Sequence, residues 1–298
     1  KLLLGKIHKM NDVKTVLGEL VTAVKQGNAN QAKDSLSFLL KSKPNLKSSW
    51  LGVANMALLT GKIELANQAL NMLTPNGQDI VTESLQQWAL KIEVGQVQVA
   101  FDSALELAKS YPSRPELNHF LSTVALQLGK QNLAKKYAEK TLEIWPTSGQ
   151  TWLILASSEK IKTDSLLLER LLNVKSEIDK TPNQLSKSSF YAALCKVYFD
   201  LGDFEQAFIY ATKANNFQKE IHKYSIDEDL QNVNFIKSHC SNSNDQINSD
   251  IEANENTPIF VIGLPRSGTS LLEQMLCHHS KIVDGGEFNG IERASRCL

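Results

Sequence analysis

The sequence predicts a mainly α-helical protein, in which a superhelix of helical hairpins is followed by the beginning of an α/β domain. Three observations predict this fold class: residue types that recur every 34 positions, apolar residues at helical spacing between them, and a β-forming run that leads into a glycine-bounded loop. An apolar content of 42% and a charged content of 21% are ordinary for a folded chain of 298 residues.

The overall charge excludes some classes of partner. Lysine and arginine together number 32, and so do aspartate and glutamate. Because no net charge attracts nucleic acid or an anionic membrane surface, we expect no nucleic-acid partner and only local anion binding. No apolar run approaches the roughly 18 residues that cross a bilayer, so we expect no membrane span. Without an export signal, the default expectation is a cytoplasmic protein, although residue 1 is not methionine.

Three residue types follow one 34-residue period. The positions are Gly27, Gly61, Gly95 and Gly129, then Ala32, Ala66, Ala100 and Ala134, and then Pro44, Pro112 and Pro146, with Gln78 filling the gap. Each type has a separate expected role. We expect glycine to make the turn between two helices, alanine to let those helices approach closely, and proline to begin the next helix in its first turn.

A further register position is expected near the start of each first helix. It is occupied by Trp50, Ser84, Asn118 and Trp152, and the apolar residues after Trp50 are Val53, Ala54 and Ala57, at helical spacing. The phase then slips, because Thr163 stands where the next glycine is due. The pattern resumes five residues late with Gly202, Ala207 and Ala214.

The segment from Phe190 to Ala214 is the clearest unit, and it closely resembles a tetratricopeptide repeat (TPR). Its matching residues are Tyr191, Leu194, Tyr198, Gly202, Phe204, Ala207 and Ala214. The resemblance covers about residues 12 to 218, in about six units. Such arrays generally bind a peptide or protein partner on a concave face. The alternative role, a spacer or brace for a neighbouring domain, is equally open at this point.

Residues 219–256 are expected to be a helical segment followed by a polar linker. One amphipathic helix is predicted from about Asp227 to Lys237, with Leu230 and Val233 on its apolar side. The stretch from Ser241 to Asn256 is too polar to fold alone, so it indicates a domain boundary or an exposed loop.

Residues 257–298 have the pattern of a strand, a loop and a helix. The run from Ile259 to Ile262 predicts a parallel strand buried on both faces. A loop of the form G-x-x-x-x-G begins at Gly263, and a helix with Leu271, Leu272, Met275 and Leu276 on one side follows to about His279. This arrangement directs backbone N–H groups and a helix N-terminus at a phosphate. Nucleotide hydrolases place a lysine where this loop has Thr269, and here Arg266 supplies the cation instead.

The run from Pro265 to Ser270 resembles the 5′-phosphosulfate loop of sulfotransferases that use 3′-phosphoadenosine 5′-phosphosulfate (PAPS). It is most similar to the tyrosylprotein enzymes and to bacterial sulfotransferases preceded by tetratricopeptide repeats, although Thr is more usual at Ser270. The resemblance implies an α/β P-loop-like domain. It also implies a cofactor site formed by Arg266, Ser267, Gly268, Thr269 and Ser270, with no metal. Arg266 would bind the phosphosulfate bridge, where negative charge grows during transfer.

The same resemblance implies that Glu287 is a second catalytic residue. It follows Gly285-Gly286, just beyond a second strand expected to begin at Ile282-Val283. In the family a glutamate at this distance from the arginine is the proposed base that takes the proton of the acceptor hydroxyl. Here Phe288-Asn289 replaces further charged residues, which puts acceptor recognition in doubt. Taken without the resemblance, Glu287 is an ordinary loop acid.

The whole reading is a sulfotransferase that moves a sulfuryl group to a hydroxyl acceptor, on a protein tyrosine or a carbohydrate. The segment from Pro258 to Leu298 is short for a parallel-sheet domain, so we expect the catalytic domain to be incomplete and the chain alone to be inactive. Two alternatives remain: a P-loop kinase or NTPase with an altered loop, and a non-enzymatic scaffold. Neither the four scattered cysteines, expected to be reduced, nor Cys277-His278-His279 predicts a metal site.

Overall fold

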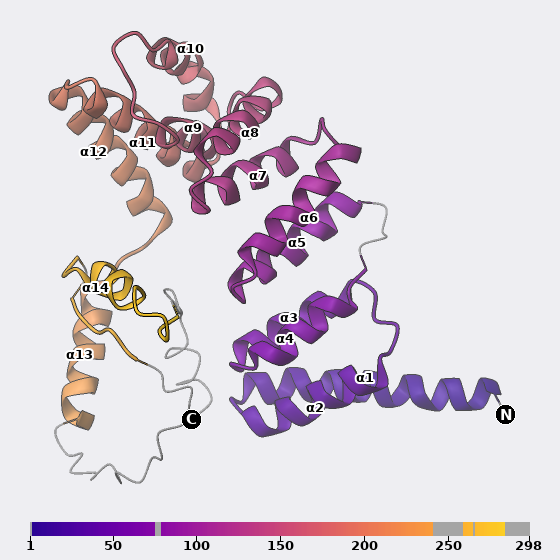
Figure 1. Ribbon diagram of the computed structural model, residues 1–298. Coiled ribbons are helices and arrows are strands. Elements are labelled where there is room, and N and C mark those ends of the chain that lie inside the picture. Colours follow the sequence, from indigo (N-terminus) through magenta and orange to yellow (C-terminus); the bar gives the residue numbers. More distant parts are fainter. Residues whose placement is uncertain (1, 75–78, 241–258, 265, 284–298) are drawn as a thin grey trace. The chain divides into compact units, whose positions relative to one another are not determined.

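The computed structural model describes residues 2–74, 79–240, 259–264 and 266–283, and these form a mainly helical chain (Figure 1). The helices are α1 (Leu2–Lys25), α2 (Ala29–Ser42), α3 (Ser49–Leu59), α4 (Ile63–Met72), α5 (Ile80–Glu93), α6 (Val97–Ser110), α7 (Pro115–Gln127), α8 (Gln131–Ile144), α9 (Gly149–Ser157), α10 (Leu167–Lys180), α11 (Gln184–Asp200), α12 (Phe204–Ile221), α13 (Ile226–Cys240) and α14 (Thr269–Leu276). Of these, α1–α12 lie in one compact unit, and α13 and α14 lie in a second.

The periodic glycines make the turns between paired helices, as predicted. Gly27, Gly61, Gly95, Gly129 and Gly202 all have positive φ, between 69° and 83°. In the turn from α3 to α4, which contains Gly61, Lys62 N donates to Ala57 O at 2.8 Å. That six-to-one bond is the Schellman arrangement, which needs a left-handed residue after the helix. Glycine, which has no Cβ, takes that conformation at low cost. The 34-residue period of glycine therefore marks the same helix C-cap in each repeat.

The periodic alanines are confirmed as points of close helix packing. Ala32, Ala66, Ala100 and Ala134 are completely buried. The apolar core divides into two clusters of buried side chains. The first is formed by α1 to α4 and extends from Leu20 to Leu73, and the second is formed by α5 to α12 and extends from Val81 to Ala214. TPR-like hairpins in series therefore form this part of the chain, with a core between neighbouring helices.

Proline has a different place from the predicted one. Pro112 and Pro146 are the second residues of the turns 111–114 and 145–148, whose fourth-residue N–H groups donate to the first-residue carbonyls at 3.3 and 3.1 Å. Pro44 likewise precedes α3. The prediction of proline in the first helical turn was wrong, because a fixed φ near −65° also suits the second position of a β-turn.

The shared register position after each proline is a buried anchor. Asn118 Nδ2 donates to Pro112 O at 3.0 Å, and Trp152 Nε1 donates to Pro146 O at 2.8 Å. Two different side chains thus satisfy the same turn carbonyl in successive repeats. At these two repeats the position holds a buried donor that reaches the turn, so two residue types can share it.

The predicted slip in phase appears as a longer connection between α9 and α10. Residues 158–166 replace the glycine turn there, and Thr163 lies within them. Ile161 is buried, and its backbone N–H donates to Asp200 Oδ2 at 2.9 Å. Asp200 also pairs with Lys196. Because α9 packs mainly on α11, the last residue of α11 is close enough to hold the connection in place.

Replacing Asp200 with alanine is expected to lower the free energy of unfolding by about 1–3 kcal/mol, because the buried Ile161 N–H loses its acceptor. Urea unfolding followed by circular dichroism measures the change. The control is Asp164→Ala, an exposed carboxylate in the same connection. Equal stability of the two variants would contradict this role of Asp200.

The effect should depend on pH. Burial raises the pKa of the Asp200 carboxyl, but the hydrogen bonds from Ile161 N and Lys196 outweigh it and hold the pKa below its ordinary value of 3.8. A depressed folded pKa means that the ionised carboxylate stabilises the fold at neutral pH, and that this contribution is lost as the pH falls below about 3.8. The stability difference between wild type and Asp200→Ala should therefore shrink in acid.

The second unit contains the predicted linker helix but not the predicted strand. Helix α13 covers the expected range from Asp227 to Lys237 and extends it at both ends. Residues 259–262 are not in a strand, and Ile262 is 86% exposed. A strand requires a neighbouring strand for its backbone hydrogen bonds, and no such partner lies in the described ranges. The start of an α/β domain is therefore not shown.

The predicted domain limits at residues 12, 218 and 256 stay predictions, since much of the linker lies outside the described residues. Of the helices in the described ranges, none is both long and apolar enough to cross a membrane.

Candidate functional site

The glycine-bounded loop begins with a tight turn whose third residue is Arg266. Ser267 N donates to Leu264 O at 3.1 Å, which closes the turn 264–267. The φ of Arg266 is 63°, in the left-handed region. For a residue with a Cβ this conformation costs about 1–2 kcal/mol. Such strain is common where a side chain is held for a ligand.

The loop folds back on its own first glycine. A Cβ added to Gly263 would lie 2.5 Å from Ser267 Oγ and 2.9 Å from Thr269 Cγ2. Both distances are shorter than real Cβ contacts, so a Cβ at this position would force the Ser267 and Thr269 side chains to move. At the other end, Gly268 has a φ of 91° and is the N-cap of α14. The two glycines of the G-x-x-x-x-G pattern thus have separate roles, one in close approach and one in the helix start.

The start of α14 presents unpaired donors. Among the described residues, the backbone N–H groups of Gly268, Thr269 and Ser270 have no acceptor, and the N-cap supplies no side-chain hydrogen bond. The hydroxyls of Thr269 and Ser270 likewise have no hydrogen-bond partner within the described ranges. The first turn of a helix also carries a partial positive charge of about half a unit. An oxyanion is the ligand that these groups fit.

Arg266 adds a full positive charge beside these donors. Its side chain is exposed, and it forms no ion pair with the described residues. The structure thus brings together five of the predicted site residues, Arg266 to Ser270, in one turn and one helix start. Thr269, where nucleotide hydrolases have lysine, is the first residue of α14. The contribution of Gly263 was missed at the sequence level, although the first glycine of the pattern was the signal for it.

The other predicted catalytic residue, Glu287, lies outside the described residues, and so does Gly285-Gly286. The second strand expected at Ile282-Val283 is not formed in the described part of the chain. Nearby, His278 Nδ1 lies 2.9 Å from Gln274 O, and His279 Nδ1 accepts from Lys281 N at 3.3 Å. Within the described ranges, His, Cys, Asp and Glu side chains form no group of three that would hold a metal ion.

The predicted cysteine chemistry agrees with the two described thiols. Cys195 and Cys277 form no disulfide with the described residues and are partly buried, and Cys195 packs against the second core cluster. Burial raises the pKa of the Cys195 thiol, which disfavours the reactive thiolate. Cys195 therefore behaves as a small apolar residue.

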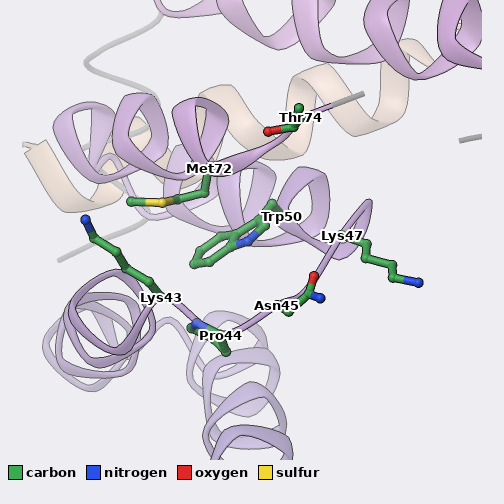
Figure 2. Close-up of a pocket in the computed structure, with 7 residues that line it drawn as sticks. All are labelled: Lys43, Pro44, Asn45, Lys47, Trp50, Met72 and Thr74. Atoms are coloured by element: carbon green, nitrogen blue, oxygen red, sulfur yellow. The ribbon is translucent and has the colours of Figure 1, made fainter. Parts of the chain in front are cut away.

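A pocket of about 230 Å³ lies in the array between the α2–α3 connection and the end of α4 (Figure 2). Figure 2 shows Lys43 and Lys47 on opposite sides of the buried Trp50 ring, with Met72 and Thr74 along another wall. The φ of Lys43 is 45°, but this has a structural cause. Lys43 is the left-handed C-cap of α2, and its N–H donates to Leu39 O. The loop at α14 is therefore the stronger candidate.

Two solved structures resemble the array. MamA (MSR-1 C2) covers 58% of this chain and 97% of its own length, at 18% identity and a TM-score of 0.39. BtubC (BKLC) from P. vanneervenii covers 72% of this chain and 93% of its own length, at 16% identity and a TM-score of 0.44. Both scores are low, so the description of the fold rests on the helices themselves.

The sequence comparisons give a relative and a family match. An uncharacterised protein of Aquifex aeolicus (strain VF5) is 27% identical over 192 residues, which are 63% of this chain and 24% of that protein. This chain therefore spans about a quarter of the length of that relative. The family model described as Sulfotransferase family matches residues 258–296, the segment that contains the loop from Gly263 to Ser270.

Proposed function

We propose that the protein containing this chain is a PAPS-dependent sulfotransferase that moves a sulfuryl group to a hydroxyl acceptor. The observation that carries the proposal is the start of α14, where three backbone N–H groups have no acceptor among the described residues and Arg266, two residues before the N-cap, carries an exposed guanidinium. The match of residues 258–296 to the sulfotransferase family supports it. The tyrosylprotein type, with a protein tyrosine or a carbohydrate as acceptor, is part of the proposal and not of the match.

The residues present fit the phosphosulfate group of PAPS. The N–H groups of residues 268–270 and the hydroxyls of Thr269 and Ser270 would hold the 5′-phosphate, and Gly263 leaves room for the loop to close. PAPS supplies the sulfuryl group. Arg266 would stabilise the negative charge that grows on the phosphate as the bridging bond to sulfur breaks. Glu287 would accept the hydroxyl proton of the acceptor as the new oxygen–sulfur bond forms.

A nucleotide-hydrolysing P-loop enzyme fits the loop less well. Its lysine would contact the β- and γ-phosphates, and the residue at that position, Thr269, has no positive charge. A sulfuryl group also carries less charge than a terminal phosphoryl group, so the need for a metal ion is smaller.

The hairpins α1 to α12 support a second part of the proposal, a protein or peptide partner bound by the TPR-like array. A non-enzymatic scaffold would share this property and lack donor binding. Placement in the cytoplasm also stays a prediction.

The test is donor binding by the full-length protein. Isothermal titration with PAPS and with adenosine 3′,5′-bisphosphate is expected to show binding without Mg²⁺, and transfer of radiolabelled sulfate to peptide and glycan acceptors tests the reaction. Tight binding of Mg·ATP in place of the bisphosphate would favour the NTPase. Absence of binding to all three nucleotides would favour the scaffold and sink the enzyme proposal.

Replacing Gly263 with alanine is expected to weaken binding of adenosine 3′,5′-bisphosphate by about tenfold or more. The new Cβ would displace the side chains of Ser267 and Thr269, two residues of the proposed nucleotide site. Gly18→Ala is the matched control, because a Cβ at Gly18 meets nothing within 4 Å. Unchanged affinity in Gly263→Ala, with normal folding by circular dichroism, would show that the loop shape does not hold the nucleotide.

A further inference from the structure

A second pocket, of about 340 Å³, lies where the first helices of three successive hairpins meet. His119 of α7 forms one wall, the connection before α9 contributes Trp145 and Thr147, and the connection before α11 contributes Asn183. Gln150, at the start of α9, also lines the pocket. No residue of the candidate loop takes part, so this α7–α9–α11 pocket is a separate feature of the array.

Two walls of the α7–α9–α11 pocket are fastened to each other. The Ser186 hydroxyl accepts from Gly149 N at 2.8 Å and donates to Thr147 O at 2.9 Å. The start of α9 and the start of α11 are therefore held at a fixed separation by one side chain. A ligand binding there would lose little free energy to ordering of the protein, because the site is formed in advance.

The His119 ring is also held in place. Its Nδ1 lies 2.8 Å from Thr151 Oγ1, and that hydroxyl lies 2.7 Å from Ser148 Oγ. Burial lowers the pKa of His119 from its ordinary value of 6.5, which favours the neutral ring at pH 7. The imidazole thus acts as a neutral hydrogen-bonding group with a fixed orientation.

Several polar groups that line the pocket are unused by the protein. Among the described residues, no partner exists for the side-chain amide of Gln150, the Asn183 Nδ2, the Trp145 indole N–H or the His119 Nε2. These are neutral donors and acceptors. Such groups form their best hydrogen bonds with a ligand whose own donors and acceptors are also neutral.

The lining contains no charged group and one large exposed ring. None of the lining side chains is a carboxylate, an ammonium or a guanidinium, so neither a cation nor an anion finds a counter-charge there. Trp145 is 44% exposed, which leaves much of the indole available for contact. A flat apolar surface surrounded by neutral hydrogen-bonding groups is complementary to a pyranose ring, which has C–H groups on its faces and hydroxyls at its edge. An amphipathic helical peptide would instead require a groove for a row of apolar anchors.

We infer that the α7–α9–α11 pocket binds an uncharged pyranose sugar, with the ring against Trp145 and the hydroxyls on Gln150, Asn183 and His119. This inference goes beyond the proposed sulfuryl transfer and does not depend on it, because the pocket and the loop share no residue. The array then carries a glycan site in addition to any surface for a protein partner.

The test uses the whole protein without nucleotide. Saturation-transfer NMR with methyl glucoside, methyl galactoside and N-acetylglucosamine is expected to show binding of at least one neutral sugar. Trp145→Ala and Gln150→Ala are each expected to weaken that binding by about tenfold or more. The control is Tyr111→Ala, which removes an exposed ring from the same repeat position one unit earlier and does not line the pocket.

The outcomes separate the alternatives. Binding by neutral sugars that is lost in Trp145→Ala, but kept in Tyr111→Ala, supports the inference. No binding by any neutral sugar, equal or stronger binding by glucuronic acid or glucosamine, or preference for a peptide overturns it. Trp145→Phe, which keeps a ring at the position, should retain part of the affinity and so separates loss of the contact from loss of the fold. None of these readouts involves PAPS, so failure here leaves the transferase proposal unaffected.

Discussion

Replacing Arg266 with alanine in the full-length protein is expected to weaken PAPS binding by about 1.5–3 kcal/mol, or about 10- to 100-fold. The guanidinium has no competing ion pair within the described residues, and its backbone is held at a φ of 63° beside the open N–H groups of α14. Its whole charge is therefore available to the ligand. Isothermal titration with PAPS gives the affinity, and the rate of sulfate transfer should fall further, by about 10²–10³-fold, because charge on the bridge grows in the transition state.

Two variants sharpen the Arg266 test. Arg266→Lys keeps the charge but loses the planar fork, so an intermediate affinity is expected. Lys281→Ala removes an exposed cation elsewhere in the second unit and should leave PAPS binding unchanged. If Arg266→Ala bound PAPS as tightly as wild type, the residue would have no part in the nucleotide site.

The largest stability effect is expected at Gly149, the first residue of α9. A Cβ there would lie 1.8 Å from the Ser186 carbonyl oxygen and 3.0 Å from Phe190 Cβ. The near atom belongs to the backbone, so a side-chain rotation cannot relieve the clash. Gly149→Ala should therefore separate α9 from α11 and lower the free energy of unfolding by about 3 kcal/mol or more, the upper end for overpacked sites. Urea unfolding followed by circular dichroism measures this loss.

Gly52→Ala is the control for Gly149→Ala. Gly52 also lies inside a helix, but a Cβ there meets nothing within 4 Å. Alanine should therefore stabilise α3 by about 0.5–1 kcal/mol through its better helix propensity. Opposite signs for the two substitutions are the expected result. Equal effects would mean that the start of α9 does not approach α11 as closely as the structure shows.

The helical part of the fold was predictable because its signals are local. A glycine at 34-residue spacing reports a helix C-cap that depends only on a few neighbouring residues, and the four such glycines, together with Gly202 after the slip in phase, have the expected positive φ. Proline was placed wrongly because its fixed φ suits both the second residue of a β-turn and the first turn of a helix, and the sequence does not distinguish them. The strand predicted at 259–262 would need a second strand, distant in sequence, to pair with, and the local pattern does not show whether such a strand is present.

The candidate site was predictable to the same extent. The positions of Arg266 to Ser270 follow from the loop pattern, whereas the positive φ of Arg266 and the contact of Gly263 with Ser267 appear only in three dimensions. No sequence pattern predicted the α7–α9–α11 pocket. Its walls meet only after the phase slip at 158–166 brings α11 against α9, and a repeat period that is interrupted does not reveal which helices become neighbours.

The division of the array core into two clusters has a consequence for how the chain responds to heat and to ligands. In a linear array each hairpin is stabilised mainly by its neighbours. Between the α1–α4 block and the α5–α12 block, apolar contact is made by the partly buried Leu90 and Val94, which pack against the first cluster. Coupling is therefore weaker at this boundary than within either block. A molecule bound in the later block should raise the melting temperature of that block by mass action more than that of the earlier one.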